Sequence, residues 1–145
     1  MRKAAGSEYA TMKAFFLFYW DRRVDPVNLP PEARPIAVLE RLEKMGTTVA
    51  VRGLRQAIND FVEESLHFDP KKVESLDSEL RERGIVTLSE LRRRYSKAYA
   101  RIKKQGRIKN DSEYYLIRNV LDDPTEKTTE ERELLAKMAF DYEGI

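Results

Sequence analysis

The chain has 145 residues, of which 27 are lysine or arginine and 25 are aspartate or glutamate, giving a net charge of +2. This length is typical of one domain and is sufficient for a buried core without a metal or disulfide staple. The absence of cysteine excludes disulfides, thiolate metal sites and cysteine nucleophiles. We therefore expect one globular domain over residues 1–145.

The first strongly apolar segment is the run AFFLFYW at residues 14–20. Apolar residues in and before it fall at helical spacing, so we expect a helix over residues 7–20, with a buried strand as the alternative. The run is too short to span a bilayer, and no secretory signal is present. We expect a cytoplasmic protein without membrane contacts, in which residues 1–11 are interpreted as a disordered or artificial extension.

Prolines, glycines and capping side chains divide the remainder into further helices. Residues 25–31 contain Asp25-Pro26 and two more prolines, and we expect a loop there. Thr47–Val51 has a strand-like composition but no partner strand, so we interpret it as an extended connector. The expected helices cover residues 35–45, 52–66, 69–84, 87–105, 110–122 and 128–142. The predicted fold is all-α, a single compact bundle of six or seven helices.

Capping signals mark four of these helix starts. Asp69 is followed by proline, which favours the first helical position. Thr87 and Thr128 each precede a glutamate by three residues, as in a capping box, and Asn110 has the same relation to Glu113. Glycine at position 106 is expected to end the helix that Thr87 begins.

The least even distribution of charge lies between Leu91 and Asn110, where nine basic residues occur and no acidic one. Helical geometry places the apolar residues of this segment on one buried seam and most of the cations on the opposite side. Tyr95 and Tyr99 fall on the seam, so we expect them to be core residues instead of platforms for nucleic-acid bases. The candidate binding residues, called the seven candidate cations below, are Arg93, Arg94, Lys97, Arg101, Lys104, Arg107 and Lys109.

A cationic helix face suits an acidic protein surface or a phosphate backbone. The alternative is a solvated face, or one that is matched by the acidic residues 122–133. We favour a non-enzymatic protein that acts through a protein partner or as a homodimer. Nucleic-acid binding is the second hypothesis, with contacts to the backbone alone, because the cations run along the whole helix 88–105. Residues 69–105 also resemble the outline of a helix-turn-helix motif.

His67 is the only histidine, and with Glu64 it matches the Glu-x-x-His element of di-iron helical bundles. Such sites use two of these elements, and the chain has one. A metalloprotein centred on Glu64 and His67 is our third hypothesis. No phosphate loop, zinc helix or calcium loop is present, so we expect no catalytic residues, metal site or cofactor.

Overall fold

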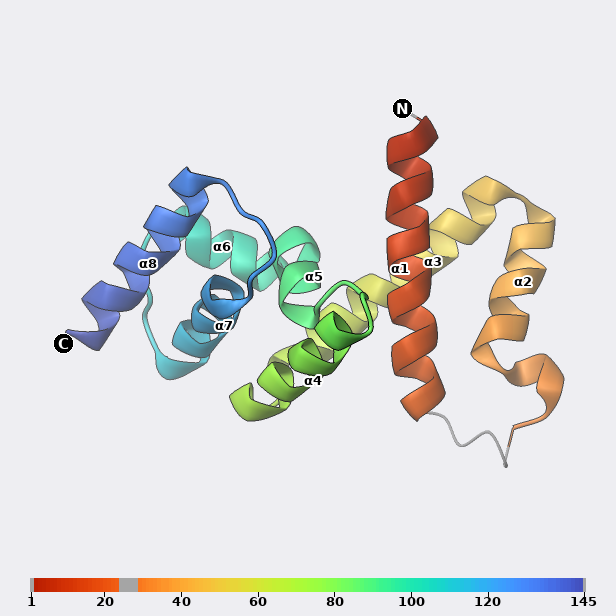
Figure 1. The fold of residues 1–145 in the computed structure, drawn as a ribbon, viewed down its shortest axis with the longest axis horizontal. Helices are drawn as coiled ribbons and strands as arrows, with labels where there is room; N and C mark the ends of the chain where they lie inside the picture. Colours follow the sequence, from red (N-terminus) through yellow and green to blue (C-terminus); the bar gives the residue numbers. More distant parts are fainter. Residues whose placement is uncertain (1, 24–28, 145) are drawn as a thin grey trace. The chain divides into compact units, whose positions relative to one another are not determined.

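The computed structural model describes residues 2–23 and 29–144 (Figure 1). The described residues form eight α-helices and two short 3-10 helices, with no strand among them, which confirms the all-α class. Contacts between Cα atoms divide the chain into two compact units, Met1–Phe61 and Val62–Ile145. The expectation of one domain over residues 1–145 stays a prediction. The predicted loop at Asp25-Pro26 lies outside the described residues.

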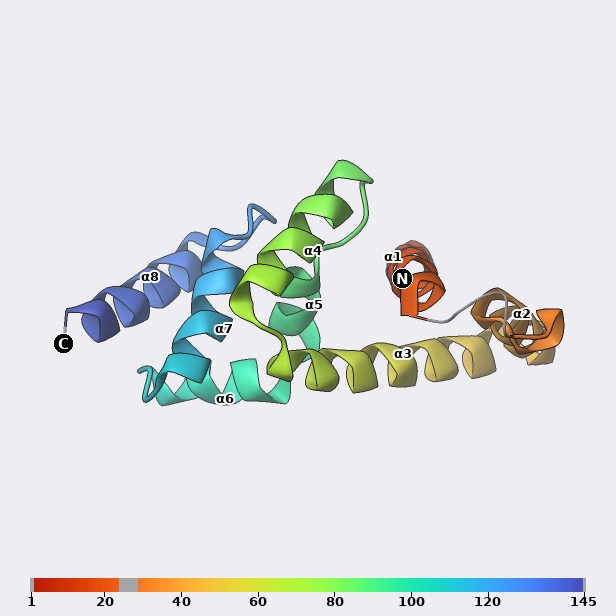
Figure 2. The ribbon, with the colours of Figure 1, turned by 90° about the horizontal axis from the view of Figure 1, so that it is seen from below.

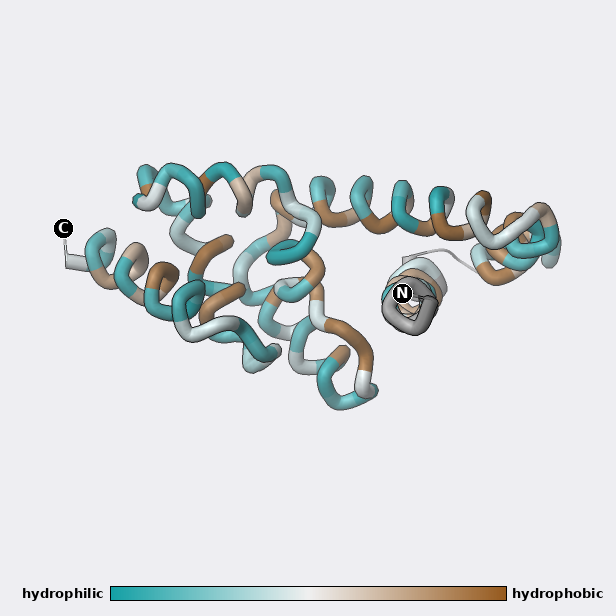
Figure 3. Tube along the Cα trace, turned by 90° about the horizontal axis from the view of Figure 1, so that it is seen from above, coloured by the Kyte–Doolittle hydropathy of each residue, from teal (hydrophilic) through white to brown (hydrophobic). Residues whose placement is uncertain are grey.

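The first unit contains α1 (Arg2–Arg23), a 3-10 helix (Pro31–Ala33), α2 (Pro35–Met45) and most of α3 (Thr47–Glu64). Apolar residues recur along one side of α3 (Figure 3). The predicted helix over residues 7–20 is confirmed within α1. Its aromatic run contributes to the core, because Phe15 and Phe18 are buried and the ring of Phe15 lies 5.2 Å from that of Phe61 on α3.

Polar contacts tie the start of α1 to its neighbours in this unit. Tyr9 donates a hydrogen bond to Glu43 of α2 at 2.6 Å, and Lys13 contacts the same carboxylate oxygen at 2.9 Å. Glu8 accepts a hydrogen bond from Arg55 of α3 at 3.0 Å. Glu8 and Tyr9 therefore pack within the unit, although both belong to the segment interpreted from the sequence as an extension.

The junction of α2 and α3 corrects one expectation. Thr47–Val51 is helical and forms the start of α3, not an extended connector. Gly46 has a φ of 136°, which L-residues rarely adopt, and this single residue turns the chain from α2 into α3. Ala50 is buried, so packing of the first turns decides their conformation over the β preference of threonine and valine.

The second unit continues from α3 through a 3-10 helix (Ser65–His67) into five α-helices. These are α4 (Pro70–Glu82), α5 (Leu88–Tyr95), α6 (Lys97–Gln105), α7 (Asp111–Asp122) and α8 (Thr129–Glu143). The central element is α7, which packs against α4, α5, α6 and α8 (Figure 2). The core cluster around it consists of Tyr99, Ile102, Ile108, Leu116, Ile117, Val120, Leu135 and Met138.

The four predicted caps of this unit are confirmed. Asp69 accepts a hydrogen bond from the backbone N–H of Lys71 at 2.8 Å. The side chains of Thr87, Asn110 and Thr128 each accept one from the backbone N–H three residues later, at 3.0, 2.9 and 3.1 Å. These bonds satisfy N–H groups that a helix start leaves without an intrahelical acceptor.

The predicted helix 87–105 is wrong in one respect, because it is two helices that meet at Ser96. The backbone of Ser96 is extended (φ −73°, ψ 124°), and its hydroxyl accepts a hydrogen bond from the N–H of Tyr99 at 3.1 Å. Ser96 thus ends α5 and caps α6. This break raises the number of α-helices in the described residues to eight, and it removes the continuous second helix of a helix-turn-helix outline.

We expect the Ser96→Ala variant to lose about 1 kcal/mol of unfolding free energy, because the N–H of Tyr99 loses its capping acceptor. Urea denaturation followed by circular dichroism measures the change. Ser78→Ala, on the exposed side of α4, is the matched control and should leave the midpoint unchanged. Equal midpoints for the Ser96→Ala variant and the unaltered chain would show that the cap contributes nothing.

Candidate functional site

Two of the seven candidate cations are bound by one buried carboxylate. Glu90 is 1% exposed and contacts Nε and Nη2 of Arg93 at 2.8 and 2.9 Å, in a bidentate pair. It also accepts a hydrogen bond from Nε of Arg94 at 2.7 Å. Glu90 therefore does not complete the predicted capping box by reaching back to Thr87. Instead, it neutralises Arg93 and Arg94.

A second carboxylate, Glu131 of α8, crosses to α5 and α6. It contacts Nη1 of Arg93 at 3.0 Å and the ammonium of Lys103 at 3.5 Å, and it accepts a hydrogen bond from the hydroxyl of Tyr99 at 2.5 Å. The acidic C-terminal segment thus matches part of the basic stretch. Tyr99 is 2% exposed, so its predicted place in the core is confirmed.

The charged groups in this network shift one another's pKa values. Burial raises the pKa of Glu90, but its hydrogen bonds to Arg93 and Arg94 outweigh burial and the net pKa lies below the usual 4.5. Burial likewise raises the pKa of Glu131, while Tyr99 and Arg93 bring it below the usual value. Both carboxylates are therefore stabilised in the ionised form.

The remaining cations lie on and after α6, and all are exposed. We call Lys97, Arg101, Lys104, Arg107 and Lys109 the cationic strip. Arg101 pairs with Glu113 of α7 at 3.3 Å, although its side chain stays 59% exposed. The side chains of the other four make no ion pair within the described part of the chain. On α6, three of these residues are spaced by four and three positions, which places them on one helix face.

Arg92 was not among the seven candidate cations, and it differs from all of them. It is 3% exposed, with Nε donating to the Ser65 hydroxyl at 3.1 Å and Nη2 donating to the Ser65 carbonyl. Burial lowers the pKa of Arg92 to about 10, with the charge of Asp77 acting in the opposite direction. Its position four residues after Leu88 puts it on the apolar face of α5, which is the signal in the sequence that could have identified it.

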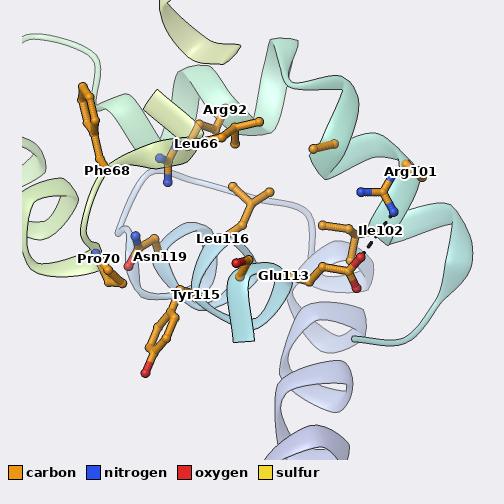
Figure 4. A pocket seen from close by; sticks show the side chains of 12 residues that line it. Leu66, Phe68, Pro70, Arg92, Arg101, Ile102, Glu113, Tyr115, Leu116 and Asn119 are labelled. Atoms are coloured by element: carbon orange, nitrogen blue, oxygen red, sulfur yellow. Dashed lines mark hydrogen bonds and ion pairs between the residues drawn. The ribbon is translucent and has the colours of Figure 1, made fainter. Parts of the chain in front are cut away.

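Arg92 lines a pocket of about 270 Å³ within the second unit (Figure 4). Its guanidinium and the amide of Asn119 lie toward one end, and the Arg101–Glu113 pair lies at the other (Figure 4). Between them the wall is mainly apolar. We call this the Arg92 pocket, and its lining residues are Leu66, Phe68, Pro70, Arg92, Ala98, Arg101, Ile102, Ser112, Glu113, Tyr115, Leu116 and Asn119.

The polar groups of this pocket are unequally satisfied. Asn119 is 6% exposed, and its side-chain amide makes no hydrogen bond to the described residues. Every fully buried side-chain nitrogen or oxygen atom in the described residues has a hydrogen-bond partner, so the amide of Asn119 is not fully buried. Because Asn119 lines the pocket, we infer that its amide contacts the solvent there. The same reasoning applies to Nη1 of Arg92. Both groups can therefore bind a ligand without breaking an existing bond.

The metalloprotein hypothesis gains no support from the geometry. Glu64 ends α3 and His67 ends the short 3-10 helix that follows. In the ranges that the structure covers, no three His, Asp or Glu side chains gather closely enough to hold a metal ion. A single carboxylate and a single imidazole are fewer ligands than such sites use.

Comparison with known proteins found no matching family model, curated protein or solved structure. Each helix in the described part of the chain is too short or too polar to span a bilayer.

Proposed function

We propose that the chain is a non-enzymatic protein that binds an acidic protein partner through the cationic strip. The observation that carries this proposal is the set of four exposed cations whose side chains have no carboxylate partner among residues 2–23 and 29–144, namely Lys97, Lys104, Arg107 and Lys109. Every other candidate cation is already paired within the chain. Opposite charge on a partner surface would favour encounter and fix the orientation of binding. The lack of cysteine fits a cytoplasmic location.

The character of this surface favours protein over nucleic acid. The guanidinium group of arginine, which can donate two parallel hydrogen bonds, is the side-chain group best suited to bind phosphates and guanine edges. Glu90 pairs with Arg93 and Arg94, and Glu113 pairs with Arg101, so three of the four candidate arginines already have a carboxylate partner. Glu113 also accepts the backbone N–H of Lys109 at 2.8 Å, which places negative charge beside the strip. A phosphate backbone would meet this carboxylate as well as the cations.

An exposed aromatic residue of the second unit supports the same conclusion. Tyr115 is 45% exposed and lines the Arg92 pocket, to which Arg101 of the strip also contributes. Tyrosine and arginine are enriched at protein interfaces, where a tyrosine offers a large contact area at a low entropic cost. Its neighbour Tyr114 is the less exposed of the two.

The test compares poly-L-glutamate with a DNA duplex of equal total charge, titrated into fluorescently labelled chain at about 50 and about 200 mM salt. We expect the polypeptide to bind and its affinity to fall with salt. The variant Lys97→Glu/Lys104→Glu should lose at least about tenfold in affinity, because two attractive contacts become repulsive. The matched control is Lys44→Glu/Lys71→Glu, which makes the same charge change at two exposed lysines elsewhere.

Two results would contradict the proposal. Tighter binding of the duplex than of poly-L-glutamate, lost in the Lys97→Glu/Lys104→Glu variant, would assign the strip to nucleic acid. Absence of binding to both polymers at the lower salt concentration would remove the strip as a binding surface.

A further inference from the structure

The Arg92 pocket combines a buried positive charge with an apolar wall. The proposed protein interface uses neither the charge of Arg92 nor this wall. Arg92 forms hydrogen bonds only to the uncharged groups of Ser65, and no carboxylate lies within ion-pair distance of it in the described residues. The charge of Asp77 acts on Arg92 in the compensating direction, but the Asp77 carboxylate is itself bound to Ser89. A buried cation in this situation gains from an anion that reaches it.

From this arrangement we infer that the Arg92 pocket binds a small organic carboxylate that carries an apolar group. The carboxylate accepts hydrogen bonds from the unused N–H groups of Arg92 and from the amide of Asn119, which lie at the same end of the pocket (Figure 4). A guanidinium and an amide are both donors that suit a planar carboxylate.

The rest of the pocket determines what the acid carries. Leu66, Ile102 and Leu116 offer aliphatic surface along the pocket, and the ion pair of Arg101 with Glu113 lies at its far end. That pair is already neutralised, so it offers no second site of net charge. A cavity of about 150 Å³ admits a benzene ring, and the pocket's volume of about 270 Å³ leaves room for a ring and an acid group.

The test is a titration of isotopically labelled chain with 3-phenylpropionate, followed by NMR shifts of the pocket amides. We expect a Kd of about 1 mM or tighter. The neutral isostere 3-phenylpropionamide should bind at least about tenfold more weakly, because it cannot pair with the charge of Arg92. Inorganic phosphate, which has charge without an apolar body, should also bind at least about tenfold more weakly. Equal affinity for the acid and its amide, or no binding of the acid, overturns the inference.

Variants separate this site from the cationic strip. Asn119→Leu removes the amide while keeping the number and branching of the side-chain heavy atoms, and Ala98→Phe fills the pocket from α6. Each should weaken binding of the acid at least about tenfold while the thermal midpoint confirms folding. The Lys97→Glu/Lys104→Glu variant should bind the acid as the unaltered chain does, and the pocket variants should still bind poly-L-glutamate. Full acid binding by both pocket variants would place the ligand elsewhere.

Discussion

We expect the Glu90→Gln variant to lose about 2–3 kcal/mol of unfolding free energy, at or just below the lower end of the range of about 3–5 kcal/mol for a broken buried ion pair. The buried carboxylate of Glu90 is the common acceptor for Arg93 and Arg94, whose side chains are 25% and 37% exposed. Solvent compensates part of their charge once Glu90 is neutral, which makes the loss smaller than for fully buried arginines. Chemical denaturation at neutral pH measures it.

The pH dependence of this loss distinguishes charge from shape. Because the pKa of Glu90 is lowered in the folded chain, the carboxylate stabilises the fold above its unfolded pKa of about 4.5. That contribution disappears as the pH falls through the folded pKa. The difference between Glu90→Gln and the unaltered chain should therefore be largest at neutral pH and shrink in acid. Glu133→Gln, at an exposed glutamate of α8, is the matched control and should show no difference at either pH.

We expect Asp77→Ala to cost about 2–4 kcal/mol, since it leaves buried polar groups unsatisfied in the second unit. Asp77 of α4 is 4% exposed and accepts the backbone N–H of Ser89 at 3.1 Å, as well as the Ser89 hydroxyl. That N–H belongs to the first turn of α5 and has no intrahelical acceptor. The carboxylate therefore caps a helix from another element, which no local sequence pattern reveals.

A double-mutant cycle of Asp77→Ala with Ser89→Ala isolates the hydroxyl bond from the backbone bond. We expect a coupling energy of about 1 kcal/mol from the hydroxyl bond, because the backbone bond is lost in both variants that lack Asp77 and cancels in the cycle. Strict additivity would mean that the hydroxyl bond adds nothing.

The titration of Asp77 runs opposite to that of Glu90. Burial raises the pKa of Asp77 more than its bonds to Ser89 lower it. The stability that this group contributes is therefore present below the unfolded pKa of 3.8 and is lost as the pH rises through the folded pKa. The Asp77→Asn variant does not titrate at this position. Its free energy of unfolding should therefore fall further below that of the unaltered chain in acid than at neutral pH.

Local signals in the sequence predicted most of the helix starts and ends correctly. The caps at Asp69 and Thr87 are short-range hydrogen bonds, so their residue types suffice to identify them. The sequence did not reveal the break at Ser96, because the apolar spacing continues across it from Leu91 to Tyr99. Serine also occurs inside helices as well as at caps. The helical conformation of Thr47–Val51 was not predicted, because its side chains favour strands, whereas burial in the first unit decided its conformation.

The candidate site was harder to predict, because it depends on pairs that are distant in sequence. The sequence showed nine cations in a segment without acids, but it could not show that Glu131 would reach Arg93 from α8. Glu90, just before that segment, was assigned to a cap and is a buried counter-ion instead. The strip that remains is therefore narrower than the predicted face.

The position of the lysines determines how binding experiments must be set up. Lys97, Lys104 and Lys109 project into water, so amine-reactive dyes and amine-coupled sensor surfaces will consume the groups proposed to bind a partner. Lys127, by contrast, is buried and donates to the carbonyls of Asp123 and Thr125 at 2.7 and 2.9 Å, which protects its nitrogen from such reagents. Because the chain has no native thiol, a single introduced cysteine offers a unique attachment point that leaves the strip intact.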